Sequence, residues 1–174
     1  ATLGFRGEAL PSIAAVADVE IVSREADSDV AAYLRLVPGS PPEAGARGAP
    51  EGTSITVRGL FERLPARKRF LRTPGSEANA IASVVTHYAL AYPEVRFRLA
   101  VDGRQTFATP GSGNLRDAVA AVYGLDAGQA MLGVSPGDGP FGVSGLVGPP
   151  ELSRSTRTYV SLFVNRRWVQ NRRL

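Results

Sequence analysis

Several residue types are scarce or missing from the 174-residue sequence, and each absence excludes a kind of site. There is no cysteine, which excludes a disulfide framework and a thiolate metal site. The single histidine, His87, excludes a histidine-rich metal cluster. No apolar run approaches the roughly 20 residues that cross a bilayer, and no apolar leader precedes a cleavage site, so we expect a cytoplasmic protein without a membrane partner. These absences do not exclude a metal ion that is bound by carboxylates or held by a nucleotide.

Nineteen of the twenty basic residues are arginine, so lysine is also nearly absent. The net charge of +4 is unevenly placed. Residues 63–72 carry five positive charges and no acid, and residues 151–174 carry six arginines against one acid, which makes each segment +5 and the remainder −6. Two basic clusters on a mildly acidic body are expected if a polyanion contacts one face. An ordinary solvated surface is the alternative.

The length suits one large domain or two small ones, and a 44% hydrophobic content is ordinary for a globular protein. The sequence begins Ala1-Thr2 without an initiator methionine, and its basic end directly follows a predicted strand. We therefore expect it to be a piece of a longer protein.

Hydrophobic periodicity predicts a mixed α/β fold. A helix is expected over residues 8–17, with Pro11 in its first turn, and a short helix over 65–71 anchored by Phe70 and Leu71. A longer helix, capped by Ser76, should end before Pro93. Its expected core stripe is Ile81, Val84, Val85 and Tyr88.

Strands are predicted by alternating apolar residues and by turn signals between them. Asp102-Gly103 predicts a tight hairpin, and Asn114 and Gly124 bracket another helix. The proline-rich and glycine-rich segment 38–50 is expected to be an exposed loop. We divide the chain into domains at 1–92 and 93–174. The predicted strands are 19–24, 30–37, 53–60, 95–101, 105–109, 131–135, 141–147 and 159–164.

Residues 4–10, GFRGEAL, are expected to form a glycine-hinged loop that opens a helix. Glycines let the main chain approach a bound group closely. The unpaired amides and partial positive charge of a helix start attract an anion, although the spacing alone also fits an ordinary loop-to-helix junction. The helix dipole explains the acid in the first turn without a catalytic role. The candidate phosphate-binding residues are Gly4, Phe5, Arg6, Gly7, Glu8, Ala9 and Leu10.

This heptapeptide resembles the signature of MutL-type DNA mismatch repair proteins, which are ATPases of the superfamily of gyrase B, the ninety-kilodalton heat-shock chaperones and histidine kinases. Three more blocks match in order: Gly52-Thr53 at a strand start, residues 60–71 (LFERLPARKRFL) and residues 163–167 (FVNRR). Many relatives have glycine at the position of Arg166, so this chain adds a charge there. The resemblance covers essentially all 174 residues.

The resemblance implies a role for each matching position. Residues 4–10 would bind the phosphates of ATP, and Gly52 with Thr53 would lie beside the adenine. Arginine suits phosphate because its planar fork donates two hydrogen bonds and stays charged, while phosphate contacts carry no base information. The implied DNA-binding residues are Arg69, Arg72, Arg166 and Arg167.

The implied fold is the C-terminal part of a Bergerat ATPase domain followed by a ribosomal-S5-domain-2-like unit, both two-layer α/β sandwiches. The implied function is slow ATP hydrolysis, with Mg²⁺, that brings two N-terminal regions together around DNA and couples a MutS-type mismatch recognition protein to repair. The glutamate general base, the magnesium-binding asparagine and the adenine loop have no match here. We therefore expect no catalytic residue, no bound cofactor and no ATP turnover in this chain alone, and a nucleoid location if it is bacterial.

Two alternatives remain. A non-enzymatic nucleic-acid-binding module fits the composition and the basic clusters equally well. A gyrase or chaperone fragment is disfavoured, because those relatives do not share the block at residues 65–71. At single residues, His87 is interpreted as structural rather than catalytic, and Trp168 as a strand anchor rather than a stacking platform for a base.

Overall fold

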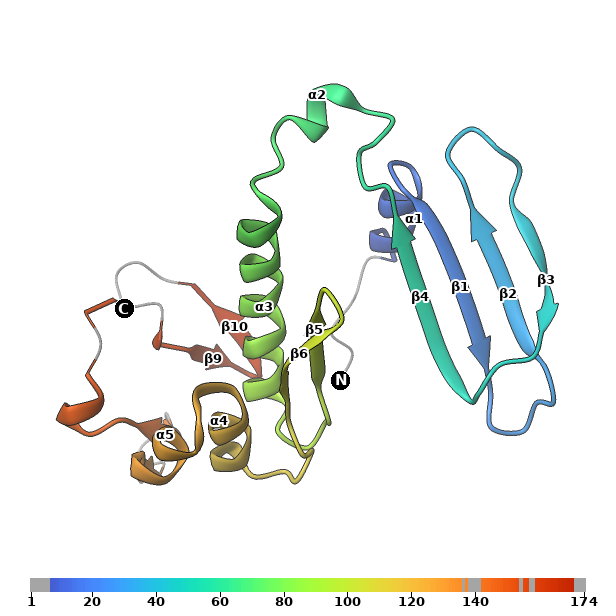
Figure 1. Ribbon diagram of the computed structural model, residues 1–174. Helices are drawn as coiled ribbons and strands as arrows, with labels where there is room; N and C mark the ends of the chain where they lie inside the picture. The colour runs from blue at the N-terminus through green and yellow to red at the C-terminus, as the bar shows by residue number, and fades with distance from the viewer. Residues whose placement is uncertain (1–6, 136, 138–141, 154, 157–158, 171–174) are drawn as a thin grey trace. The chain divides into compact units, whose positions relative to one another are not determined.

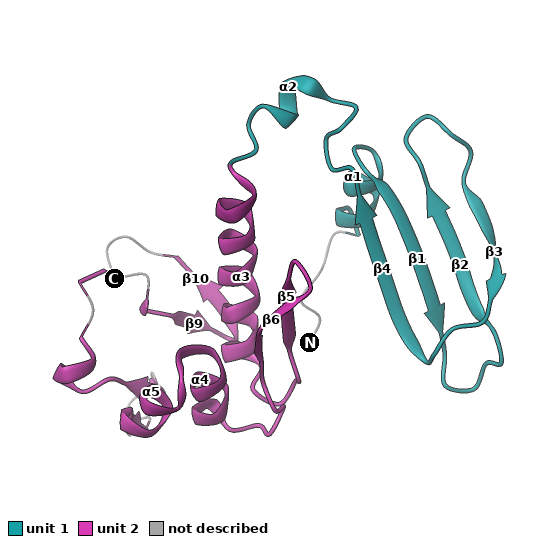
Figure 2. Cartoon of the chain, viewed as in Figure 1, with its two compact units in different colours: residues 1–72 teal, residues 73–174 magenta. Residues whose placement is uncertain are grey.

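The computed structural model describes residues 7–135, 137, 142–153, 155–156 and 159–170 (Figure 1). It divides into two compact units, Ala1–Arg72 and Thr73–Leu174, which are described in turn (Figure 2). Helices and antiparallel sheets occur in both, which confirms the mixed α/β class. In the described part of the chain, no helix is long and apolar enough to span a bilayer.

Unit 1 is built on a four-stranded antiparallel sheet in the order β3-β2-β1-β4 (Figure 1). Successive side chains of a strand point to opposite faces. Val19 and Ile21 of β1 therefore share a face with their cross-strand partners on β2 and β4. Val19 is buried, whereas Ile55 and Val57 at the β4 edge are about half exposed. The strands are β1 (Asp18–Arg24), β2 (Ala31–Leu36), β3 (Glu43–Arg47) and β4 (Gly52–Arg58).

Strand β3 corrects the prediction that residues 38–50 form a loop without regular structure. All five of its residues are exposed, so no apolar alternation marks it in the sequence. Main-chain pairing with β2 holds it instead. Arg47 reaches Glu20 at 3.3 Å and lies 4.8 Å above the Tyr33 ring. Strands β1 and β2 supply these partners.

Two short helices flank the sheet strands in sequence. Helix α1 (Ala9–Ala14) lies within the predicted range 8–17, with Pro11 in its first turn, but ends three residues earlier than predicted. Helix α2 (Pro65–Lys68) is a single turn and ends three residues earlier than predicted. The prediction that Phe70 anchors this helix is wrong, because its side chain is 87% exposed. The chain leaves the helix before Phe70, so no helical face can bury it.

Unit 2 begins with its longest helix, α3 (Pro74–Ala91). Thr73, and not Ser76, is the N-cap: the Thr73 hydroxyl accepts a hydrogen bond from the Ser76 amide at 3.3 Å. The predicted core stripe is wrong for three of its four residues, since Ile81, Val84 and Tyr88 are 57%, 45% and 42% exposed. Val85 is half-buried. The buried face is His87, Ala89 and Leu90.

The face of α3 that is buried is set by its partners within unit 2. Leu90 packs with Ala118 and Val119, and Leu115, Tyr123, Met131, Leu146 and Phe163 surround this cluster. The helix therefore belongs to unit 2. The domain boundary between residues 92 and 93 stays a prediction about the family's domains.

The remaining elements of unit 2 are short. The hairpin of β5 (Arg98–Val101) and β6 (Arg104–Ala108) turns at Asp102 and Gly103, whose φ angles of 50° and 75° confirm the predicted tight turn. Asn114 caps α4 (Leu115–Tyr123), and Gly124 ends it at φ 100°. The others are α5 (Leu125–Ala130), β7 (Leu132–Val134), β8 (Gly145–Val147), the 3₁₀ turn Pro150–Leu152, β9 (Leu162–Val164) and β10 (Arg167–Val169).

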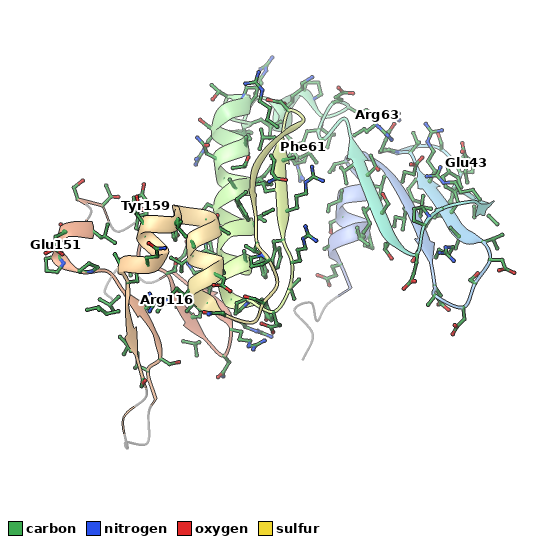
Figure 3. The ribbon with its side chains drawn as sticks, turned by 60° about the horizontal axis from the view of Figure 1, so that its bottom comes forward. Glu43, Phe61, Arg63, Arg116, Glu151 and Tyr159 are labelled. Atoms are coloured by element: carbon green, nitrogen blue, oxygen red, sulfur yellow. The ribbon has the colours of Figure 1, made fainter. Side chains whose placement is uncertain are left out.

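Arg116 joins α4 to the end of α5. Its guanidinium donates to the carbonyls of Gly128 and Met131, each at 2.7 Å (Figure 3). The last carbonyls of a helix have no amide partner within the helix, so a side chain that reaches them stabilises the helix end. The two helices are thereby held together by a cation as well as by packing.

Candidate functional site

The predicted phosphate loop is described from its second glycine onward. Gly7 has φ 64°, is exposed, and has no atom within 4 Å of where a Cβ would stand. Glu8 is the N-cap of α1, and its carbonyl accepts the first helical hydrogen bond from Ser12 at 3.1 Å. The amides of Ala9 and Leu10 lie in the first turn, where a helix supplies no acceptor. Outside the described residues lie Gly4, Phe5 and Arg6.

The described half of the loop thus has the local geometry that the sequence predicts: a glycine at positive φ followed by an exposed helix start. The side chain of Glu8 makes no capping hydrogen bond. Phosphate binding by these residues stays a prediction.

Gly52 and Thr53 open strand β4. Gly52 has φ 113°, a conformation that side chains with a Cβ rarely adopt. Thr53 stands opposite Ser23 of β1, and their hydroxyl oxygens are 2.7 Å apart. A hydroxyl has one donor and two acceptor positions, so Thr53 keeps hydrogen-bonding capacity beyond this contact. Gly52 and Thr53 are both exposed, and the contact orients the threonine hydroxyl.

Ser23 is a residue that sequence reasoning misses. It lies 30 residues before Thr53, in the middle of an ordinary strand pattern. Only the register between β1 and β4 identifies it. The predicted role of Thr53 beside an adenine remains untested, but the structure shows how its side chain is held.

The basic cluster of residues 63–72 begins with Arg63, whose contacts tie it to the sheet. Its guanidinium donates to the Pro38 carbonyl and lies 3.7 Å from the Asp18 carboxylate. Arg69 and Arg72, the predicted DNA contacts, lie in the exposed segment that follows helix α2. A count of charges alone treats these arginines as equivalent.

Arg166 lies in the turn between β9 and β10, and Arg167 directly follows that turn. Asn165 and Arg166 have φ angles of 50° and 64°, which describes a tight turn that normally favours glycine at its second position. The Arg166 guanidinium donates to the Glu94 carboxylate and lies 5.3 Å above the Tyr92 ring. These contacts hold the Arg166 side chain beside the segment that follows helix α3.

Glu94, whose carboxylate accepts the hydrogen bond from Arg166, has a shifted pKa. A backbone N–H and then the Arg166 guanidinium lower the pKa of Glu94, because both favour its charged form. A nucleic-acid phosphate would therefore compete with Glu94 for Arg166. Arg167 begins β10 and is exposed.

The four candidate DNA-binding arginines fall into two pairs. Arg69 and Arg72 belong to unit 1, and Arg166 and Arg167 belong to unit 2. The other arginines of the C-terminal basic cluster lie outside the described residues: Arg154, Arg157, Arg172 and Arg173.

His87 and Trp168 form a contact that supports structural roles for both. Their rings stack at 3.6 Å between centroids with an interplanar angle of 20°. His87 is buried, and its Nδ1 lies 2.5 Å from the Ser83 carbonyl oxygen. The pair attaches β10 to α3, which supports both interpretations. Within the described ranges, no group of three His, Cys, Asp or Glu side chains is arranged to hold a metal ion.

Comparison with known proteins assigns the family. A family described as DNA mismatch repair protein, C-terminal domain, matches residues 119–174. The chain is 47% identical over 170 residues to the DNA mismatch repair protein MutL of Desulforudis audaxviator, an alignment that covers 98% of this chain and 30% of that protein. This chain belongs to the MutL family. The MutL protein of Limosilactobacillus reuteri is 42% identical, with 98% of this chain and 25% of that protein covered.

Solved structures show the same fold. The Aquifex aeolicus MutL ATPase domain complexed with ADP is 26% identical, has a TM-score of 0.72, and is matched over 95% of this chain and 64% of that chain. The N-terminal domain of a DNA repair protein, at 21% identity and a TM-score of 0.77, shares the fold over 98% of this chain and 57% of its own. The chain thus spans less than a third of the two MutL proteins named above and about two thirds of the solved MutL ATPase domain.

Proposed function

We propose that the protein containing this chain is an ATP-operated DNA mismatch repair factor. In this proposal, ATP and Mg²⁺ binding orders the loop at residues 4–10 and brings two copies of the N-terminal region together around DNA. Slow hydrolysis then resets the assembly, and a MutS-type protein signals the mismatch. The observation that carries the proposal is the 47% identity to a MutL protein over 98% of the chain.

Two features of unit 1 and one relative support nucleotide binding. The exposed turn at Gly7 leads into helix α1, whose first amides have no acceptor within the helix and can meet an anion. The Thr53 hydroxyl is oriented by Ser23 and retains hydrogen-bonding capacity. A relative with this fold and 26% identity was solved in complex with ADP.

ATP hydrolysis needs more than these residues. A general base must lie within hydrogen-bond reach of the attacking water, and we assign no residue of this chain to that role. We therefore propose that the chain contributes phosphate and adenine contacts, while other segments of the protein supply the base and the Mg²⁺ ligand.

The DNA contacts are proposed to be sequence-tolerant phosphate contacts from the four candidate arginines. Counterion release makes such binding fall with salt. If each of the four neutralises one phosphate, the slope of log affinity against log salt should be roughly −3 to −4. We further propose a cytoplasmic location, at the nucleoid in a bacterium.

The test is nucleotide binding by the full-length protein, compared between Thr53→Ala and Thr53→Ser. Loss of one hydrogen bond costs about 1 kcal/mol, so the alanine variant should bind ATP roughly fivefold more weakly, and the serine variant, which keeps a hydroxyl, should bind close to normally. Equal binding by both variants would remove Thr53 from the site. DNA binding with no ATP binding at all would instead favour the non-enzymatic nucleic-acid-binding module.

A further inference from the structure

We propose that Arg63 is a positioning residue that couples the nucleotide loop to the basic cluster, and that it does not itself contact DNA. Together with the turn at Phe61, it ties the end of helix α1 to the start of helix α2. The inference rests on the proposed function, because it concerns how nucleotide binding would alter DNA binding. All of its parts lie within unit 1.

The first observation is a strained turn at Phe61. Its φ of 62° is uncommon for any residue with a Cβ and an outlier for a bulky one. The Phe61 amide donates to the Val16 carbonyl at 2.9 Å, and the Phe61 carbonyl accepts from Leu64 at the same distance. Such a conformation persists only where surrounding contacts determine it. Val16 lies two residues after helix α1, so the turn is bonded to the segment that the phosphate loop leads into.

The second observation is the pair of contacts made by Arg63, two residues later (Figure 3). One guanidinium nitrogen donates to the Pro38 carbonyl, just beyond β2, and the other lies 3.7 Å from the carboxylate of Asp18, the first residue of β1. A planar guanidinium presents donors on separate nitrogens in a fixed geometry, so it can join two such points at once. The guanidinium is thus held by the ends of two strands of the sheet.

The residues that make these contacts lie next to helix α1 on one side and next to helix α2 on the other. Val16 and Asp18 directly follow helix α1, and Phe61 and Arg63 directly precede helix α2, where the Lys68 amide donates to the Leu64 carbonyl at 2.9 Å. Binding of a triphosphate at the start of helix α1 would be transmitted through α1 to these contacts. It would then reach the exposed basic residues of the cluster: Arg67, Lys68, Arg69 and Arg72.

The guanidinium of Arg63 already has an acidic partner. A phosphate could bind it only by displacing Asp18. Charge alone would count Arg63 as one of five equivalent DNA contacts. The geometry assigns it a different task.

Asp18→Asn distinguishes the two roles by the sign of its effect on DNA affinity in the full-length protein. If Arg63 were a DNA contact, removing its acidic partner would release it and strengthen binding. If it positions the cluster, binding should weaken about three- to tenfold relative to Asp27→Asn. Asp27, an exposed acid in the β1–β2 turn, is the matched control for the lost negative charge. Equal or tighter binding by the Asp18 variant overturns the proposal.

The salt dependence gives a second measurement on the same protein. Arg63→Gln should lower DNA affinity and leave the slope of log affinity against log salt unchanged, because no phosphate contact is lost. Arg67→Gln serves as the comparison for an exposed cluster residue. A slope that becomes shallower by about 0.9 in the Arg63 variant would show a direct phosphate contact and refute the positioning role.

Coupling is measured as the ratio of DNA affinities with and without a non-hydrolysable ATP analogue. Arg63→Gln and Arg63→Lys should both bring this ratio toward one while nucleotide affinity stays within about twofold. Phe61→Val should lower the ratio more than Phe61→Gly, because a β-branched residue resists positive φ. An undiminished ratio in both Arg63 variants overturns the proposal.

Failure of the proposed function gives a different pattern. In that case the unsubstituted protein itself shows a ratio of one or no nucleotide binding. The sign of the Asp18 effect and the salt slope still decide the role of Arg63.

Discussion

Unit 1 and unit 2 hold their candidate site residues by different means. In unit 1, a continuous four-stranded ladder of main-chain hydrogen bonds places Thr53 opposite Ser23. In unit 2, the described strands form three separate two-stranded sheets, and side chains join the β9–β10 pair to helix α3 and to the segment after it. His87 stacks on Trp168, and Arg166 binds Glu94. The position of the β9–β10 turn should therefore be more sensitive to side-chain substitution than the position of β4.

The strongest test of this contrast is truncation of a buried side chain in unit 2. Leu90→Ala removes a side chain that is 7% exposed, and the cavity should cost about 2–5 kcal/mol of unfolding free energy. Denaturation followed by the fluorescence of Trp168, the only tryptophan, reports unit 2. Val19→Ala in unit 1 is the matched truncation. If Val19→Ala shifted the unfolding transition seen by Trp168 fluorescence as far as Leu90→Ala does, the stabilities of the two units could not be separated by this measurement.

Gly128→Ala tests the close approach of α5 to α4. An added Cβ would lie 2.6 Å from the Ala120 Cβ and 3.0 Å from its Cα, so the helices must separate. We expect a loss of about 1–3 kcal/mol by thermal or urea unfolding. Gly75→Ala in α3 is the control, because no atom lies within 4 Å of the new Cβ and alanine favours helix, which predicts a gain of up to about 1 kcal/mol. A loss of equal size at both positions would exclude a packing cause.

The N-cap of α3 should show a smaller effect. Thr73→Ala removes the acceptor for the Ser76 amide and should cost about 1 kcal/mol in urea unfolding. Ser76→Ala should cost less, since it removes only a hydroxyl-to-hydroxyl contact with Thr73. The reverse order would restore Ser76 as the cap that the sequence pattern indicates.

The smallest effect concerns the contact between Glu94 and Arg166. Because the pKa of Glu94 is lowered in the folded state, its contribution to stability is present above the ordinary glutamate range and is lost as the pH falls through the folded pKa. The backbone N–H is the larger cause, so Arg166→Gln should raise this pKa only partly toward its ordinary value. An NMR titration of the Glu94 carboxyl group measures both. A full return to the ordinary pKa would make Arg166 the main cause.

Much of the local structure follows from the sequence because its causes lie within a few residues. Asp102-Gly103 forms the predicted turn, and Asn114 and Gly124 begin and end α4 as expected. The alternation in residues 53–57 predicts β4. The family blocks are likewise contiguous stretches, so the amino-acid sequence is sufficient to infer membership in the MutL family, and the similarity to known MutL proteins confirms it.

Tertiary structure decided what depends on partners distant in the sequence. Ser23 and Thr53 are 30 residues apart, and Glu94 and Arg166 are 72 apart, so no local pattern connects them. The buried face of α3 follows from where α4 and β10 pack, which is why its apparent apolar stripe is exposed. Arg63 has the same local signal as its basic neighbours, and only the ends of β1 and β2 distinguish it. Composition and periodicity specify what a residue can do, whereas register and packing specify which partner it meets.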